Sequence, residues 1–253
     1  QTQLPIDPFA IAKDVEISVF AKEATSGVSG TLIRVGDNFA ISYAAHIASE
    51  GFQRFSVSHE LGHYFLDGHV DHVLGPNGIH ESRAEHMSAD HFEREADRFA
   101  AALLMPFAPF TSAALTVGDG LCGIEELASL CRTSLTATAI RYVECAADEP
   151  IAVVLTKMEE IQFCAMSERF KKLPGITWRR KGDRVPSRSA GYRLALDPPR
   201  IRDAEREDGD VHLHDWFDQG PDLRLAEEAI GLGRSGQILT VLSIEKFTDD
   251  SDA

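Results

Sequence analysis

The sequence is short of cysteine, has few basic residues for its length and lacks any long apolar run. Its four cysteines in 253 residues include no CxxC pair, which fits a reduced compartment better than a disulfide scaffold. No apolar stretch approaches the roughly 18 to 20 residues that cross a bilayer, and residues 1–8 do not resemble a signal peptide. We therefore expect a cytoplasmic protein without a membrane partner.

Positive charge is scarce, with 25 Lys and Arg residues against 40 Asp and Glu residues and a formal charge of −15. Such a chain repels phosphate backbones, so direct nucleic-acid binding is not expected. Hydrophobic residues make up 43% and charged residues 26%, which is close to the globular average and argues against wholesale disorder. The length allows one large domain or two modest ones.

Patterning predicts an α+β protein in three parts. Residues 1–117 are expected to form a domain with a small antiparallel sheet and helices, 118–149 a helix-turn-helix-like segment, and 150–253 a mixed α/β domain. Helices are predicted at 5–14, 50–66, 88–105, 125–130 and 135–145. Strands are predicted at 15–20, 30–35, 39–44, 151–156, 161–165, 192–196, 223–232 and 237–244, and loops at 67–86, 171–190 and 198–210.

One predicted helix, 50–66, carries the segment His59-Glu60-Leu61-Gly62-His63. Two histidines four residues apart lie about 6 Å apart along a helix and on one face, so both imidazoles can reach one ion. Apolar residues surround this helix, and burying two imidazoles and a carboxylate without partners would cost several kcal/mol. The segment therefore predicts one zinc ion held by His59 and His63, with Glu60 as the general base toward a water molecule.

A catalytic zinc needs a third protein ligand, and the segment 85–97 offers Glu85, Glu93 and Glu95. Glu93 is favoured and Glu95 is the next candidate, since Glu85 falls in a predicted loop and Glu95 on another helix face. Asp97 lies one turn beyond Glu93 and is expected to accept the outer N–H of a ligating histidine.

The two helical segments together resemble the ImmA/IrrE metallopeptidases. The resemblance rests on FSVSHELGH at 55–63 and FEREADRFAAALLMP at 92–106, and covers about residues 30–145. It implies a gluzincin-like, zincin-type domain in which Glu93 is the third ligand. From residue 150 onward the likeness is loose, and it implies a GAF-like sensor domain there.

The same resemblance implies a substrate class, because members of this family cleave helix-turn-helix repressors in stress responses and mobile-element switches. The leading prediction is thus an intracellular zinc endopeptidase that hydrolyses such a repressor. The alternative is a regulatory binding protein whose zinc has a structural role and which cleaves nothing; the intact Glu60 argues against it.

Several weaker signals accompany the motif. A donor for the oxyanion is expected from Tyr43, His46 or a histidine of the following loop. His69, His72, His80, His86 and His91 crowd this region in no recurrent ligand pattern. We interpret them mainly as a solvated flank of the cleft, with an active-site role or a second metal as the alternatives. The basic run at 171–188 is interpreted as a solvated loop, with partner docking as the alternative.

Overall fold

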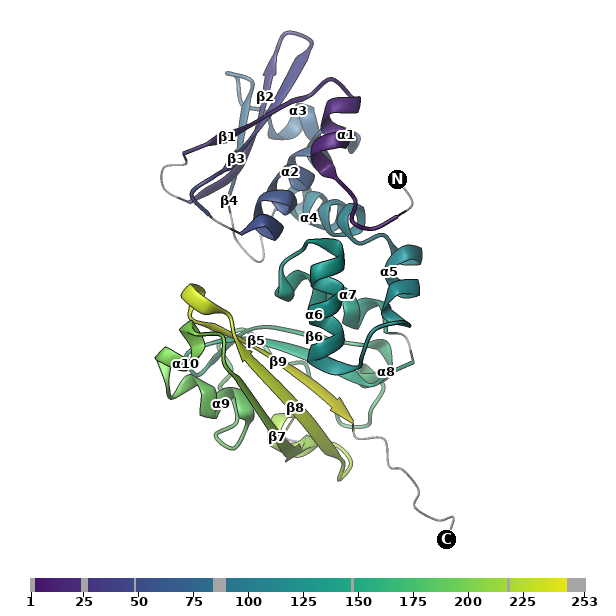
Figure 1. The fold of residues 1–253 in the computed structure, drawn as a ribbon, viewed down its shortest axis with the longest axis vertical. Coiled ribbons are helices and arrows are strands. Elements are labelled where there is room, and N and C mark those ends of the chain that lie inside the picture. The colour runs from purple at the N-terminus through teal and green to yellow at the C-terminus, as the bar shows by residue number, and fades with distance from the viewer. Residues whose placement is uncertain are drawn as a thin grey trace. The chain divides into compact units, whose positions relative to one another are not determined.

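The computed structural model describes residues 3–23, 27–47, 49–83, 90–146, 148–217 and 219–244. The chain divides into two compact units, the first formed by residues 1–117 and 126–138 and the second by 118–125 and 139–253. Each unit has its own sheet (Figure 1). The predicted division at 117/118 and 149/150 stays a prediction.

The sheet of the first unit has four strands in the order β1-β3-β2-β4. The strands are β1 (Ser18–Lys22), β2 (Val28–Val35), β3 (Asn38–Ala44) and β4 (Ile79–Arg83). β2 pairs antiparallel with both β3 and β4, whereas β1 runs parallel to β3. The tight β2–β3 turn contains Gly36, whose φ of 62° is a left-handed conformation that glycine adopts without strain.

Five helices accompany this sheet: α1 (Pro8–Asp14), α2 (Glu50–Phe65), α3 (His69–Val73), α4 (His91–Leu104) and α5 (Phe107–Ala114). α2 begins after Ser49, whose hydroxyl accepts the N–H of Phe52 at 3.4 Å, as an N-cap residue does. Asp90 caps α4 in the same way through the N–H of Phe92 at 2.8 Å.

The core of the first unit lies between the sheet and α2. Leu32 and Ile41 from the sheet pack with Val57 and Leu61 of α2, and all four side chains are fully buried. The other side of α2 packs on α4. There Gly62 permits close approach, because a Cβ at this position would lie 3.1 Å from the Cα of Ala96. Contacts on both sides explain why α2 is apolar around its axis.

The predicted loop at 67–86 is wrong in two places, since it contains α3 and β4. Its glycines hid an alternating strand, in which His80 pairs with Leu32 and Glu81 with Thr31. Pairing with a neighbouring strand decides such a short segment, and local composition does not reveal it.

The second unit is built on a five-stranded antiparallel sheet in the order β6-β5-β9-β8-β7. Its strands are β5 (Ile151–Lys157), β6 (Glu160–Met166), β7 (Arg206–His212), β8 (Arg224–Gly231) and β9 (Gln237–Ile244). Its short helices are α8 (Glu168–Lys171), α9 (Ala190–Ala195), α10 (Pro198–Arg202) and α11 (Leu213–Phe217), with a 3-10 turn at Gly233–Ser235. One part of its core gathers Phe170, Trp216 and Phe217, all fully buried.

Two predictions fail in this unit. The expected strand 192–196 is helix α9, which packs on β7, β8 and β9 (Figure 1). Ser189 caps it by accepting the N–H of Tyr192 at 3.1 Å, and Ala190 and Leu194, four residues apart, are buried. The expected loop 198–210 contains α10 and most of β7, a charged strand at the edge of the sheet, where charge discourages further pairing.

Helices α6 (Gly120–Cys131) and α7 (Leu135–Cys145) correspond to the two helices predicted at 125–130 and 135–145. Residues 126–138 belong to the first unit, and residues 118–125 and 139–145 to the second. The architecture is mixed α+β, as predicted. None of the described helices is long and apolar enough to cross a membrane.

Candidate metal centre

α2 presents two histidines toward one point in the first unit. The Nε2 atoms of His59 and His63 lie 3.0 Å apart, and both side chains are buried. Both nitrogens point to the same side because four residues make slightly more than one helical turn. This is the pairing that the sequence predicted for the two imidazoles.

α4 brings a carboxylate to the same point. Glu93 Oε2 lies 3.2 Å from Nε2 of His59, and Glu93 Oε1 lies 3.4 Å from Nε2 of His63. The close approach of α2 and α4 at Gly62 makes these distances possible. Glu95, the rival candidate, does not join the group.

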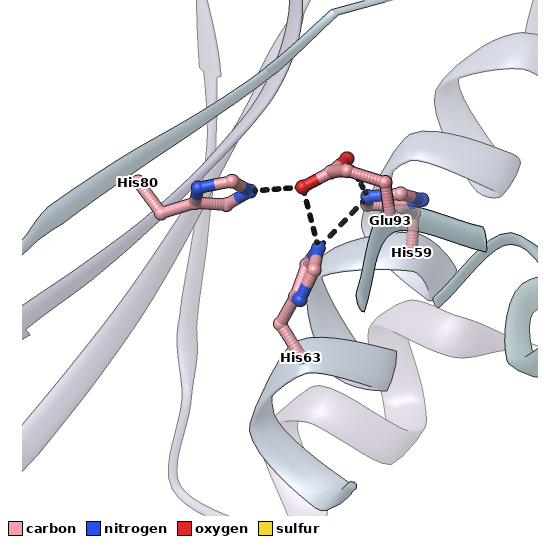
Figure 2. Close-up of side chains that lie close together, drawn as sticks. All are labelled: His59, His63, His80 and Glu93. Atoms are coloured by element: carbon pink, nitrogen blue, oxygen red, sulfur yellow. Dashed lines mark hydrogen bonds and ion pairs between the residues drawn. The ribbon is translucent and has the colours of Figure 1, made fainter. Parts of the chain in front are cut away.

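A third histidine completes the group from the sheet. His80 on β4 places its Nε2 3.1 Å from Oε1 of Glu93, and one donor atom from each of the four residues lies within 4.8 Å of every other. Figure 2 shows all four side chains converging, His80 from the strand and the others from the helices. His80 was not predicted as a ligand, because the spacing of the histidines in its segment fits no recurrent ligand pattern, and an active-site role was only the alternative interpretation. The alternation of residues 79–83 was the available signal.

The outer nitrogens of the helical histidines are held by further side chains. His59 Nδ1 lies 2.9 Å from Oδ1 of Asp97, the contact expected from the sequence. His63 Nδ1 lies 3.1 Å from Nδ1 of His69, whose Nε2 lies 3.1 Å from Oε2 of Glu95. A consistent proton assignment has His63 donating to His69 and His69 donating to Glu95. Because each of these contacts holds the proton on Nδ1, the Nε2 atoms of His59 and His63 are free to bind a metal.

Glu60 lies beside this group and is completely buried. Among the described residues, neither of its carboxylate oxygens has a hydrogen-bond partner. Burial raises the pKa of Glu60, against the opposing effects of His59 and the nearby Ser82 hydroxyl. That hydroxyl is itself 3.1 Å from Nε2 of His80. Gly30 of β2 leaves room for the carboxylate, because a Cβ there would lie 2.4 Å from Oε1 of Glu60.

Without a metal, protons and charges compensate one another in this group. Burial alone would lower the pKa of His59, but Asp97 and Glu93 raise it to about 10. Burial likewise opposes ionisation of Glu93, yet its three histidine neighbours hold its pKa far below the usual range. The pKa of His63 is lowered, chiefly by burial. A metal ion must therefore displace at least the proton of His59, so binding should weaken as pH falls.

The remaining candidates lie outside the group of four. Tyr43 packs edge-on against Phe9 with ring centroids 5.6 Å apart, and His46 is exposed in the turn after β3. His72 stacks on the ring of Phe92 at 3.8 Å. Glu85 and His86 lie outside the described residues. The role of Tyr43 or His46 as an oxyanion donor stays a prediction.

Comparisons with known proteins bear on this site. Residues 18–142 match the model of the IrrE N-terminal-like domain, Peptidase_M78. No curated protein matches the chain significantly. A solved structure described as a Mycobacterium tuberculosis transcriptional regulator superposes with a TM-score of 0.60 over 95% of this chain and 71% of that one, at 15% identity. At this identity the similarity shows a shared fold alone.

Proposed function

The chain belongs to the IrrE N-terminal-like family of M78 peptidases through residues 18–142, and we propose that it is a zinc-dependent endopeptidase acting on a regulatory protein. The observation that carries the proposal is Glu60. A fully buried carboxylate without a hydrogen bond of good geometry is costly, and the charges of His59 and His80 and the nearby Ser82 hydroxyl compensate it only in part, because its pKa stays raised. A general base for hydrolysis requires a carboxylate in this position.

The donor set suits zinc. Imidazole nitrogens and a carboxylate oxygen are its usual ligands, at about 2.0 to 2.2 Å. Four ligands at this bond length lie about 3.4 Å apart around one ion. With Oε1 as the donor of Glu93, its distances to His63 and His80 are 3.4 and 3.1 Å, and the two helical histidines lie 3.0 Å apart. All four donor atoms lie within 4.8 Å of one another. His59, His63 and Glu93 would hold the ion, which when bound polarises a peptide carbonyl and acidifies a water molecule.

The protein's own groups then have separate tasks. Glu60 takes a proton from the attacking water and passes it to the leaving amine, and its raised pKa brings it closer to the neutral range where such transfer is efficient. Asp97 holds the proton of His59 on Nδ1, and His69 with Glu95 does the same for His63. These contacts keep both Nε2 lone pairs directed at the ion.

We propose a helix-turn-helix transcriptional repressor as the substrate, with a stress response or a mobile element as the setting. This rests on the resemblance to ImmA/IrrE peptidases and on family membership. The second unit would control activity or substrate choice, because the site lies entirely within the first unit.

The test uses the full chain and the repressor encoded beside its gene. Zinc content is measured by elemental analysis, and cleavage by mass spectrometry, for the wild type, Glu60→Gln and the control Glu50→Gln. Glu50 makes a matched control because it lies at the exposed start of the same helix. We expect one zinc in all three proteins and a rate about 10²- to 10⁴-fold lower in Glu60→Gln alone. An unchanged rate in Glu60→Gln would overturn the mechanism.

One observation favours a second function. His80 gives the site a fourth protein donor, and structural zinc sites are closed in this way, whereas catalytic sites keep a position open. The chain would then be a regulatory binding protein without proteolysis. Loss of the first unit's fold on zinc removal, together with no cleavage of any repressor, would favour that function.

A further inference from the structure

The role of His80 distinguishes the zinc endopeptidase from the regulatory binding protein. Its surroundings differ from those of His59 and His63. His59 and His63 come from a buried helix, and each has its outer nitrogen held by a neighbour, Asp97 or His69. His80 comes from β4, an edge strand of its sheet. Its two polar contacts, with the Ser82 hydroxyl and with Glu93, are both made by Nε2, and within the described part of the chain its outer nitrogen, Nδ1, has no hydrogen bond or ion pair.

An outer contact fixes a histidine's orientation and strengthens it as a ligand, and losing such a contact typically costs 10- to 100-fold in metal affinity. By this criterion His80 is the weakest donor of the three histidines. Its Nε2 is nevertheless in position, 3.1 Å from Oε1 of Glu93, and its ring lies edge-on to that of His63 with centroids 4.6 Å apart. It is the fourth member of the donor group.

We propose that His80 is a displaceable fourth ligand that closes the zinc site in the resting protein and must leave before a peptide can be cleaved. This inference rests on the proposed peptidase function and adds its regulation. It reconciles a closed donor set with a buried base, because Glu60 has a use only when His80 has made room for a water molecule.

Alternative roles for His80 predict different behaviour. A histidine that only donates to the oxyanion would leave the resting metal with a water ligand, and its loss would slow cleavage about 10²- to 10³-fold. A permanent structural ligand would never leave, and its removal would weaken zinc binding without producing a faster enzyme. The displaceable ligand predicts no water on the resting metal and a faster enzyme once His80 is removed.

The test replaces zinc with cobalt, whose visible spectrum reports the ligand set whether or not the protein cleaves anything. The full chain is compared with His80→Ala, with His80→Gln in case the smaller side chain disturbs β4, and with the control His72→Ala. His72 lies in the same region and stacks on Phe92 outside the donor group. Each protein is titrated from about pH 6 to 9, a range that includes the pKa near 7 of a zinc-bound water.

We expect the wild type and His72→Ala, each saturated with cobalt at every pH, to show a spectrum independent of pH, because every ligand is a protein group. Both His80 variants should show a spectral transition from an ionising water, an affinity for zinc at least tenfold lower, and repressor cleavage faster than the wild type. A wild-type spectrum with its own water transition, or His80 variants that bind zinc as tightly as the wild type, would overturn the proposal.

The two proposals fail separately. If the spectra behave as expected but no variant cleaves a repressor, the fourth ligand stands as a structural one, and both the peptidase function and the displacement are wrong. If the wild type cleaves in a Glu60-dependent way but its metal carries water at rest, the peptidase stands and the closed site is wrong.

Discussion

Each unit of this protein buries a glutamate, and the two glutamates are treated differently. Glu60 in α2 is 0% exposed and Glu227 in β8 is 1% exposed, and burial raises the pKa of both. Glu227 accepts hydrogen bonds from the indole Nε1 of Trp216 and from the backbone N–H of Ala190, the latter at 2.6 Å. Glu60 accepts none among the described residues.

On the proposed function, the difference separates a structural glutamate from a catalytic one. The two hydrogen bonds of Glu227 join α11 and the start of α9 to the sheet. They offset the free-energy cost of burying this carboxylate and help to order the second unit. Glu60 has no such hydrogen bonds and faces only the charges of His59 and His80 and the Ser82 hydroxyl, and the space around its carboxylate is left by a glycine. A burial cost of this kind is commonly tolerated where function requires it.

The largest effect is expected when the space beside Glu60 is filled, which tests whether this carboxylate differs in role from that of Glu227. Gly30→Ala would put a Cβ 2.4 Å from Oε1 of Glu60, so the carboxylate must move. We expect repressor cleavage to fall about 10²- to 10⁴-fold, as for loss of the base, while zinc affinity is unchanged. The readout is the cleavage assay used for Glu60→Gln.

The matched control lies beside Glu227. Gly209→Ala would put a Cβ 2.8 Å from Nη2 of Arg193, but this is the end of a flexible side chain that can give way. It should leave cleavage unchanged. Full activity in Gly30→Ala would show that the position of Glu60 does not matter and would contradict the assigned role.

Removing each glutamate tests which one the fold uses. Glu227→Ala leaves two buried donors without an acceptor and should destabilise the second unit by about 3 to 5 kcal/mol. Glu60→Ala removes no hydrogen bond of good geometry but does remove a charge that faces His59 and His80, and it should cost the metal-free first unit less, about 1 kcal/mol. Hydrogen exchange resolved by peptide measures both units in one experiment. Equal losses in the two variants would remove the distinction between the two carboxylates.

Metal removal should also act on one unit only. With free zinc at about 100 times its dissociation constant, binding stabilises the unit that holds it by about 2.7 kcal/mol. Chelation should therefore speed amide exchange in α2 and α4 and leave β5 and β9 unchanged. Slower exchange in both units on adding zinc would show that metal binding stabilises both units.

The sequence predicted the helical half of the site better than the sheet half. Helical spacing is local, so the pairing of His59 with His63 on α2 and of Glu93 with Asp97 on α4 follows from residues four apart on single helices. The contact between Asp97 and His59 then requires only that the two helices pack together. His80 could not be found this way, because its place depends on pairing of β4 with β2. The relay through His69 to Glu95 depends on α3, which spans only five residues. The buried role of Glu227 in β8 was not predicted for the same reason, because its hydrogen-bond partners are 11 and 37 residues away in the sequence.

The smallest expected effect is a pH slope in the second unit. Burial is the main cause of the raised pKa of Glu227, with Asp215 adding to it and the bonds from Ala190 and Trp216 and the charge of Arg193 opposing it. Between the ordinary value of 4.5 and the raised value, folded protein holds a proton that unfolded protein has lost. Stability of this unit should therefore fall as pH rises through that window, by at most about 1.4 kcal/mol per pH unit.

Glu227→Gln should remove this contribution to the slope, whatever its effect on stability at a single pH. Both tryptophans, Trp178 and Trp216, lie in the second unit, so denaturant unfolding followed by tryptophan fluorescence reports the correct part of the chain. Glu168→Gln is the control, because that carboxylate is exposed beside Lys171 and its neutralisation removes no desolvation cost. A slope in Glu227→Gln as steep as in the wild type would mean that Glu227 titrates as an ordinary carboxyl, and that its two hydrogen bonds offset the whole cost of burial.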